Sequence, residues 1–231
     1  MGLKESGLRG SLRNVSVSID AIPDSVVTQY EFEDDSDTST AIDSVGDNNA
    51  TLSEPTYNDT IVKVGSNALE FDGSDDELNS TSAVDLVASG DTETVSFAAW
   101  VYPRDNDVRV PIGYWADTGN RFYVFNDGSG NWRFGHRVGG SGDDANGTQI
   151  TTEEWVHVYI ELTQNDARMK LDNTEVATYN HSTDISNLGM MTLRSGYGPF
   201  GNYGNQVVDD YHAMDGALSD SELQSIIDRA N

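Results

Sequence analysis

The sequence of 231 residues contains no cysteine, so no disulfide can stabilise the fold. A compact chain of this length buries roughly 70–75% of its unfolded surface, which makes a disulfide unnecessary. The absence of cysteine therefore says little about the redox compartment. No run of residues approaches the ~20 apolar positions that a membrane-spanning helix needs, and the first residues lack the apolar stretch of a secretory signal peptide. We expect neither membrane insertion nor export by the signal-peptide route.

Basic residues are also scarce. The sequence has 13 Lys and Arg against 39 Asp and Glu, a net charge of −26, and only three lysines, Lys4, Lys63 and Lys170. A chain without a basic face cannot release counterions from phosphates, so we expect no nucleic-acid partner. An acidic, lysine-poor surface is typical of proteins in molar salt, where the Debye length falls to about 3 Å. We predict a halophilic source. The aromatic content, 9%, argues against disorder as the cause of the acidity.

The first part of the chain differs from the rest. Its charged residues are three basic and two acidic ones, namely Lys4, Arg9, Arg13, Glu5 and Asp20. Glycines and scattered apolar residues accompany them, and Pro23 closes the segment. We predict an extended anchoring arm over residues 1–23 that docks on another protein, followed by one domain over residues 24–231. A frayed terminus or a first β-strand is the alternative for the arm.

Beyond the arm, short runs of Val, Ile, Tyr and Phe alternate with clusters of Gly, Asn, Asp and Ser, which predicts strands joined by turns. The predicted strands are 26–33, 49–53, 67–72, 94–102, 108–114, 121–126, 131–137, 155–163, 168–171, 174–179, 190–195 and 206–213. Near the C-terminus, Ser219 and Glu222 form a capping box that begins a helix. Its apolar stripe is Leu223, Ile226 and Ile227. The sequence therefore predicts an all-β, antiparallel two-sheet sandwich with one short C-terminal helix and an extended N-terminal arm.

Five stretches carry a family resemblance. In chain order they are "YEFEDDSDTSTAIDSVGDNNATL", "LEFDGSDDELN", "TVSFAAWVYP", "TEEWVHVYIELTQNDARMKLDNTEVAT" and "QVVDDYHAMDGALSDSELQSII". Together they resemble the laminin G-like domains, which are concanavalin A-like jelly rolls, over residues 24–231. The resemblance implies a jelly-roll sandwich. Two positions depart from the family pattern: Tyr159 stands where small residues are common, and Asn173 replaces the usual turn glycine.

Carboxylates in a catalytic arrangement are not found. Glycosidases of this fold use two carboxylates on one face of a strand, and their signature resembles E-x-D-x-x-E. The stretch "EFEDD" begins similarly, but its last required position is Ser36. The sequence also has no Gly-x-Ser-x-Gly elbow, phosphate-binding loop or zinc-type spacing. We predict that the protein is not an enzyme.

Acids surround a glycine in the stretch "FDGSDDELN". A tight turn there would bring Asp72, Asp75 and Asp76 close together, and Ca²⁺ takes six to eight oxygen ligands. In the resembled family, metal sites often join early and late segments of the chain, which implies Asp209 or its neighbour Asp210 as a fourth ligand. We predict a structural calcium site at Asp72, Asp75, Asp76 and Asp209. The alternative is that these acids only belong to the acidic surface.

Three glycine-containing loops combine aromatic and polar side chains: 113–120, 139–148 and 195–206. Sugar-binding sites on sandwiches pair an aromatic platform with amides and acids, and glycines keep the ring faces accessible. The predicted ligand-binding residues are Tyr114, Trp115, Asp117, Asn120, Tyr197, Phe200 and Tyr203. Packing beneath their own loops, or against a neighbouring subunit, is the alternative for these aromatic residues.

The leader, "GLKESGLRGSLRNVS…AIPDS", resembles those of tail, fibre or capsid-decorating proteins of haloarchaeal viruses. This resemblance implies a non-catalytic surface protein of a virion with a lectin-like domain. The arm is then expected to bind other virion proteins, and the far loops to bind a glycan or protein of the host surface. We also expect a homo-oligomer. The alternative is a carbohydrate-binding module or adhesin of a halophilic archaeon, located outside the cell or on its surface.

Overall fold

The computed structural model describes most of the chain in five segments. The described residues are 22–80, 94–106, 112–188, 192–195 and 203–230. Nearly all of the predicted anchoring arm, residues 1–21, lies outside them. Within the described part of the chain, no helix has both the length and the apolar character needed to cross a membrane.

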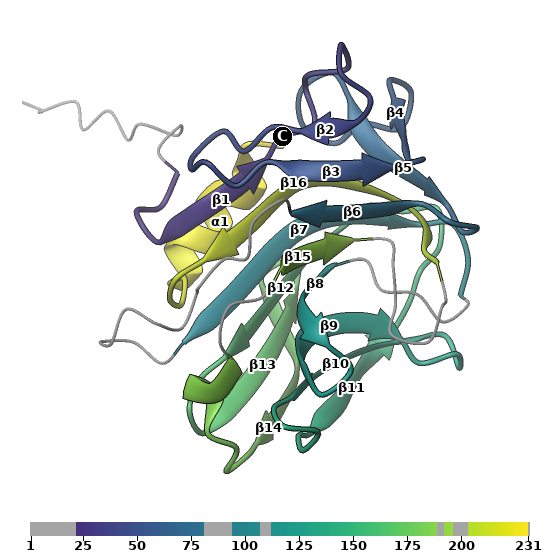
Figure 1. The fold of residues 1–231 in the computed structure, drawn as a ribbon. Helices are drawn as coiled ribbons and strands as arrows, with labels where there is room; N and C mark the ends of the chain where they lie inside the picture. The colour runs from purple at the N-terminus through teal and green to yellow at the C-terminus, as the bar shows by residue number, and fades with distance from the viewer. Residues whose placement is uncertain (1–21, 81–93, 107–111, 189–191, 196–202, 231) are drawn as a thin grey trace, which may run out of the picture.

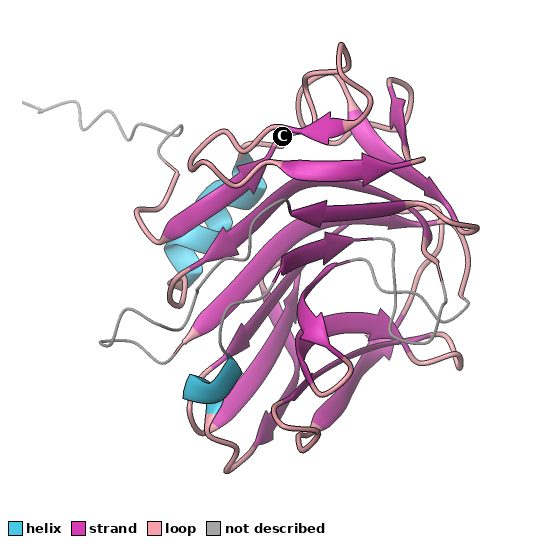
Figure 2. Ribbon diagram, in the orientation of Figure 1, coloured by secondary structure: helices cyan, strands magenta, loops and turns pink. Residues whose placement is uncertain are grey.

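Two antiparallel sheets face each other and form a sandwich (Figures 1 and 2). In spatial order, the first sheet consists of β14 (Thr174–Asn180), β13 (Asp166–Leu171), β12 (Val156–Leu162), β7 (Val95–Pro103), β16 (Asn205–Met214), β5 (Ala68–Asp72) and β4 (Thr56–Asn58). Its eighth strand, β1 (Val26–Tyr30), pairs with the second half of β16, beyond the part that pairs with β5. The predicted jelly-roll sandwich is confirmed.

The second sheet also has eight strands. In spatial order they are β11 (Asp144–Gln149), β10 (Asn131–Arg137), β9 (Asn120–Asn126), β8 (Ile112–Asp117), β15 (Thr192–Ser195), β6 (Glu77–Ser80), β3 (Ala50–Ser53) and β2 (Thr40–Ala41). A short 3₁₀ helix, η1 (Ile185–Leu188), precedes β15. Each predicted strand has a counterpart among the described residues, with bounds that differ by a few residues, while residues 108–111 and 190–191 of two predicted strands lie outside the described residues. The strands β2, β4, β6 and β11 were not predicted, because none of them has an apolar alternation.

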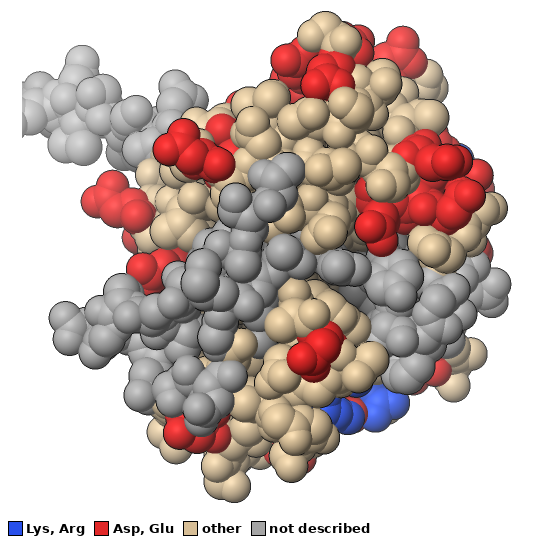
Figure 3. Space-filling view, viewed as in Figure 1, with Lys and Arg blue, Asp and Glu red and all other residues tan. Residues whose placement is uncertain are grey.

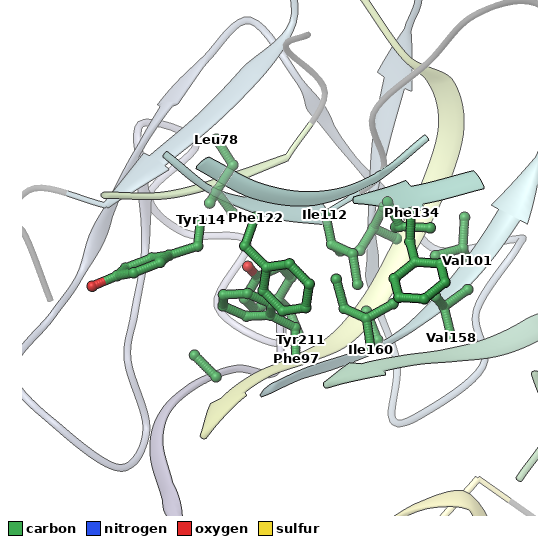
Figure 4. Close-up of a cluster of buried hydrophobic side chains, with 14 of the residues drawn as sticks. Leu78, Phe97, Val101, Ile112, Tyr114, Phe122, Phe134, Val158, Ile160 and Tyr211 are labelled. Atoms are coloured by element: carbon green, nitrogen blue, oxygen red, sulfur yellow. The ribbon is translucent and has the colours of Figure 1, made fainter. Parts of the chain in front are cut away.

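The main core lies between the sheets, and β7 is buried on both of its faces. Phe97 and Val101 point into the core between the sheets, where Figure 4 shows them beside Tyr211 and Val158. The alternate residues of β7 instead pack beneath the C-terminal helix. This arrangement explains why the whole strand is apolar, as expected for the middle of a sandwich.

The C-terminal helix α1 (Asp220–Asp228) covers the outer face of the first sheet. Its predicted capping box is confirmed, because the Ser219 hydroxyl accepts from the Glu222 N–H and the Glu222 side chain accepts from the Ser219 N–H. The predicted apolar stripe, Leu223, Ile226 and Ile227, is buried against this face. The helix therefore encloses a second, smaller core.

The departure at Asn173 has a structural reason. Asp172 and Asn173 form the two-residue turn between β13 and β14, with φ angles of 48° and 61°. Both angles are positive, as a type I′ hairpin turn requires. Asn and Asp tolerate this region better than other non-glycine residues, so Asn173 can replace a glycine without breaking the hairpin.

Candidate functional site

Tyr114 does not lie on a recognition loop, contrary to the sequence prediction. It is part of β8 and is fully buried, with its ring 5.8 Å from that of Phe97. Figure 4 shows it among the core side chains between the sheets. The alternation of β8 turns Tyr114 inward together with Ile112, and it turns Trp115 outward, where that side chain is 5% exposed. Tyr114 is therefore a core residue and cannot present a ring to a ligand.

Asp117 and Asn120 hold two turns together. Asp117 Oδ1 accepts from the Gly119 N–H at 2.6 Å and from the Asn120 amide at 3.2 Å. Asn120 Oδ1 accepts from the Gly139 N–H at 3.0 Å. This hydrogen bond ties the turn between β8 and β9 to the turn between β10 and β11. These hydrogen bonds lower the pKa of Asp117. Both side chains thus have a structural role in the turns.

The third predicted loop is described only in part. Tyr197 and Phe200 lie outside the described residues, and Tyr203 is half-buried just before β16.

The loop predicted over 139–148 is also different from expectation, because its second half is the strand β11. The edge of β10 supplies the hydrogen bonds of β11, so pairing rather than an apolar pattern makes this segment a strand.

The acidic turn does bring three of the four predicted metal ligands together. Carboxylate oxygens of Asp72, Asp75 and Asp76 lie within 4.8 Å of one another. Asp72 and Asp75 are exposed, whereas Asp76 is 4% exposed and its Oδ2 accepts from the Asp72 N–H at 2.5 Å. Burial, with the charges of its two neighbours, raises the pKa of Asp76. Oxygen donors of this kind suit a hard cation such as Ca²⁺, with other ligands completing its shell.

Asp209 is not part of this cluster, and its prediction as a metal ligand is wrong. It lies on β16 opposite Trp100, whereas the acidic turn follows β5 opposite Asn205. Its Oδ2 accepts from the N–H groups of Lys63 and Val64, both at 2.9 Å. Asp209 is fully buried, and burial raises its pKa to about 7. Its role is to hold the loop between β4 and β5 against the sheet.

A pocket that was not predicted lies where the two sheets meet at β10 and β13. We call it the indole pocket, because Trp132 and Trp155 both line it; its volume is about 220 Å³. The other lining residues are Thr148, Gln149, Thr151, Glu154, Val156, Leu171 and Asp172. Trp155 is held by an edge-on contact with Tyr102, with ring centroids 5.5 Å apart. Trp132 is 3% exposed and belongs to the main core, so it forms the floor of the pocket, whereas the half-buried Trp155 offers its ring beside hydroxyls, an amide and carboxylates.

The polar side chains of the indole pocket are available to a ligand. In the described part of the chain, the side chains of Thr148, Gln149, Thr151 and Glu154 make no hydrogen bond with another protein group, and all four are exposed. Asp172 differs, because its Oδ1 accepts from the His157 N–H at 2.9 Å. A hydroxyl-rich ligand would meet donors and acceptors that need not first break an internal contact.

Sequence reasoning missed this pocket because its parts are far apart in the chain. Trp132 lies on β10 of the second sheet, and Trp155, 23 positions later, directly precedes β12 of the first sheet, so only the fold brings them together. A partial signal was present in "TTEEW", where two threonines and two glutamates precede a tryptophan. That stretch is the exposed turn before β12, and it supplies three residues of the pocket.

Comparison with known proteins gives a family match. The profile of the Concanavalin A-like lectin/glucanases superfamily, in a laminin G-type group, matches residues 72–224. None of the curated proteins matches the sequence. The matched segment includes the acidic turn, β7 to β16 and most of α1, and it contains the whole indole pocket.

Two kinds of solved structure are similar to the chain. One is domain 4 of AbnA, a GH43 extracellular arabinanase from Geobacillus stearothermophilus, in complex with arabinotriose; the identity is 16%, the TM-score is 0.67, and the match covers 89% of this chain and 98% of that one. The other is the receptor-binding domain of botulinum neurotoxin C/D mosaic serotype. Its identity is 12% and its TM-score is 0.69, and the match covers 89% of this chain and 51% of that one. The binding domain of botulinum neurotoxin DC in complex with SialylT is similar too. Its identity is 13% and its TM-score is 0.68, and the match covers 91% of this chain and 53% of that one. The chain spans about half the length of the toxin domains, and at these identities the likeness shows the fold alone.

Proposed function

The chain belongs to the concanavalin A-like lectin/glucanase superfamily, and on that premise we propose that it is a non-catalytic, lectin-like domain that binds a neutral saccharide in the indole pocket. The observation that carries the proposal is the half-buried ring of Trp155 beside four exposed polar side chains, Thr148, Gln149, Thr151 and Glu154, that make no hydrogen bond with other described residues. Indole rings pack against the apolar face of a sugar ring. The amide of Gln149 and the hydroxyls of Thr148 and Thr151 can then pair with sugar hydroxyls.

The charge of the pocket decides which sugars fit. Its two carboxylates, Glu154 and Asp172, are exposed, and no Lys or Arg lines it. A sugar with its own carboxylate or sulfate would be repelled, whereas neutral hydroxyls can donate to these oxygens. The proposed ligand is therefore a neutral oligosaccharide. Similar solved domains support binding as the activity, since one was obtained with arabinotriose.

The same carboxylates do not favour hydrolysis. Glu154 and Asp172 stand on two separate exposed turns, and Asp172 already accepts from the His157 N–H. A glycosidase needs an acid and a partner carboxylate facing one bond at a fixed separation. On the described outer faces of β9 and β10, where a saccharide could lie across the sheet, the side chains are arginines and aromatic rings. We assign both pocket carboxylates to hydroxyl recognition.

The wider setting that we propose is the surface of a virion from a halophilic host. The net charge of −26 and the scarcity of lysine support a molar-salt environment, and the basic, glycine-containing segment 1–23 supports attachment to another protein. Deleting residues 1–23 should then abolish incorporation into particles and leave the sandwich folded. Unchanged particle composition would instead favour the alternative, a module or adhesin of the cell.

Saccharide binding is tested by titrating the full chain with arabinotriose and other neutral oligosaccharides in concentrated KCl, followed by tryptophan fluorescence. We expect saturable binding that Trp155→Ala weakens by about tenfold or more, since an aromatic platform contributes over 1 kcal/mol. Gln149→Ala should also weaken binding, whereas Gln224→Ala, an exposed amide on α1, should not. Binding that survives both pocket variants would contradict the assignment, and release of shorter oligosaccharides would contradict a non-catalytic role.

A further inference from the structure

A group of arginines and aromatic rings covers the outward side of the second sheet over β8, β9 and β10. We call it the arginine face; its members are Trp115, Arg121, Tyr123, Phe125, Arg133 and Arg137. Cross-strand pairing sets their order, because Arg121 lies between Trp115 and Arg137, and Phe125 lies opposite Arg133. Tyr123 lies between Gly113 and Gly135, which have no side chains to cover it.

The guanidinium groups lie against the aromatic rings. Arg121 Cζ is 5.1 Å from the ring centroids of both Trp115 and Tyr123, and Arg133 Cζ is 5.5 Å from that of Phe125. Such stacking fixes the planes of the guanidinium groups. Arg121 is 7% exposed and is the most buried of the three arginines. The side chains of Arg133 and Arg137 are 35% and 25% exposed. Arg133 is held by its stacking on Phe125, whereas Arg137 is held by donation from its Nη1 to His136 O at 2.7 Å.

Two arginines of the arginine face share one acid, unlike the other lysines and arginines that form ion pairs in the described chain. Elsewhere in the described chain, Arg104, Arg168, Lys170 and Arg229 each pair with one acid of their own. Here Arg133 and Arg137 share the single carboxylate of Asp144. Arg121 donates to the main-chain oxygen of Thr118, makes no ion pair with a described residue, and helps to lower the pKa of Asp117. In Figure 3 most of the visible Lys and Arg atoms gather near the lower edge, near β11, whereas acids are scattered over the upper, right-hand and left-hand parts. Such a gathering of arginines is a local exception in a chain of net charge −26.

Asp144 shows what the arginine face can hold. Its Oδ1 accepts from Arg133 Nε at 3.0 Å and also from Arg133 Nη2, while its Oδ2 accepts from Arg137 Nη2 at 3.3 Å. The carboxylate therefore lies between two guanidinium groups, with one oxygen accepting two donors of Arg133 and the other accepting from Arg137. The face is built for a carboxylate, and Asp144 is an internal competitor for it.

We propose that the arginine face is a second binding surface, separate from the indole pocket, that takes a saccharide bearing a carboxylate, such as a uronic acid residue. The carboxylate pairs with Arg133 and Arg137, and the sugar ring packs on the half-buried ring of Phe125. The overall negative charge argues against a long polyanion such as nucleic acid. In molar salt only groups in direct contact escape screening, which favours a short ligand held by hydrogen bonds.

The test measures the affinity of the full chain for trigalacturonate and for its carboxyl-reduced, neutral form. We expect only the acidic form to bind at this face, and Arg133→Gln or Arg137→Gln to weaken it roughly 10- to 100-fold, as for a lost charged hydrogen bond. The matched control is Arg168→Gln, whose side chain is 33% exposed and paired with Glu161 on the first sheet. It should leave the affinity unchanged, and so should Trp155→Ala in the indole pocket.

A gain-of-affinity variant separates binding from folding defects. Asp144→Asn removes the internal competitor and should raise the affinity for trigalacturonate, which a damaged fold cannot do. Binding of the reduced form that Arg133→Gln weakens as much as it weakens trigalacturonate binding, no binding of trigalacturonate, or an equal effect of the Arg133 and Arg168 variants would each overturn the proposal. Arginine-dependent binding of a short polyglutamate peptide in place of trigalacturonate would also overturn it, in favour of an acidic protein partner.

Discussion

The hydroxyl of Tyr159 accepts a hydrogen bond of 3.0 Å from the main-chain N–H of Leu218. The same hydroxyl donates to Glu161 Oε2 at 2.6 Å. Tyr159 and Leu218 are both buried, one on β12 and the other directly before the capping residue of α1. This contact fixes where the helix begins above the outer face of the first sheet. It also explains a tyrosine at a position where the family commonly has a small residue.

Tyr159→Phe should therefore destabilise the protein. The variant keeps the ring but leaves the Leu218 N–H and the Glu161 carboxylate without this partner in a buried site, and such a loss costs roughly 1–3 kcal/mol. We expect a lower midpoint in denaturant titration and faster hydrogen exchange in α1 than in β12. Tyr211→Phe is the control, because its hydroxyl reaches only Gly113 O, at 3.4 Å. An equal loss in both variants would show that Tyr159 has no special role at the helix.

Local patterns explain which features the sequence could predict. The turn at Asp72–Asp76 was identified because its three acids are close in the chain, and β7 because both of its faces are apolar. Tyr114 was misplaced because the glycines around it suggested a loop, although its alternation with Ile112 already indicated an inward side chain. The indole pocket and the arginine face depend on which strands become neighbours. No short stretch of sequence contains that information.

Acidification should destabilise the fold through its buried histidines. Burial lowers the pKa of His157 from 6.5 to about 3 and that of His136 to about 4, and it also lowers the pKa of His212. The unfolded chain therefore takes up protons between pH 6.5 and these lower values while the folded chain does not. Stability is then complete above pH 6.5 and falls as the pH decreases, by about 2 kcal/mol each for His157 and His136 at pH 5.

His157→Asn tests this mechanism at one position. The variant will be less stable at pH 7, because a buried ring is lost beside Trp100, but its stability should decrease less between pH 7 and pH 5. Denaturant midpoints over this range measure the difference. Asp209 has the opposite effect on the pH dependence. Because burial raises its pKa to about 7, the stability that its protonated carboxyl contributes is lost as the pH rises from 3.8 to 7. A pH dependence that is parallel to that of the parent chain would contradict the assignment to His157.

Salt should raise the thermal stability because the charge is so one-sided. Going from about 0.1 M to about 1 M KCl shortens the Debye length from about 10 Å to about 3 Å and so screens the mutual repulsion of surface acids. The triple variant Asp24→Asn, Asp35→Asn, Asp47→Asn changes the net charge from −26 to −23. These three exposed side chains make no hydrogen bond or ion pair with described residues. The variant should melt higher at low salt and respond less to KCl; an unchanged response would show that repulsion is not the cause.

Calcium should reverse the effect of removing one acid from the turn after β5. Without a cation, burial raises the pKa of Asp76, and repulsion from the carboxylates of Asp72 and Asp75 raises it further. Asp75→Asn should therefore raise the melting temperature in EDTA.

If Ca²⁺ binds at the three carboxylates, the parent chain gains stability with the logarithm of the Ca²⁺ concentration, and Asp75→Asn loses most of that gain. The variant is then more stable than the parent in EDTA and less stable in millimolar Ca²⁺. A control at a distant exposed acid, Asp47→Asn, should show no such reversal, and a parent melting temperature that ignores both EDTA and Ca²⁺ would rule out the site.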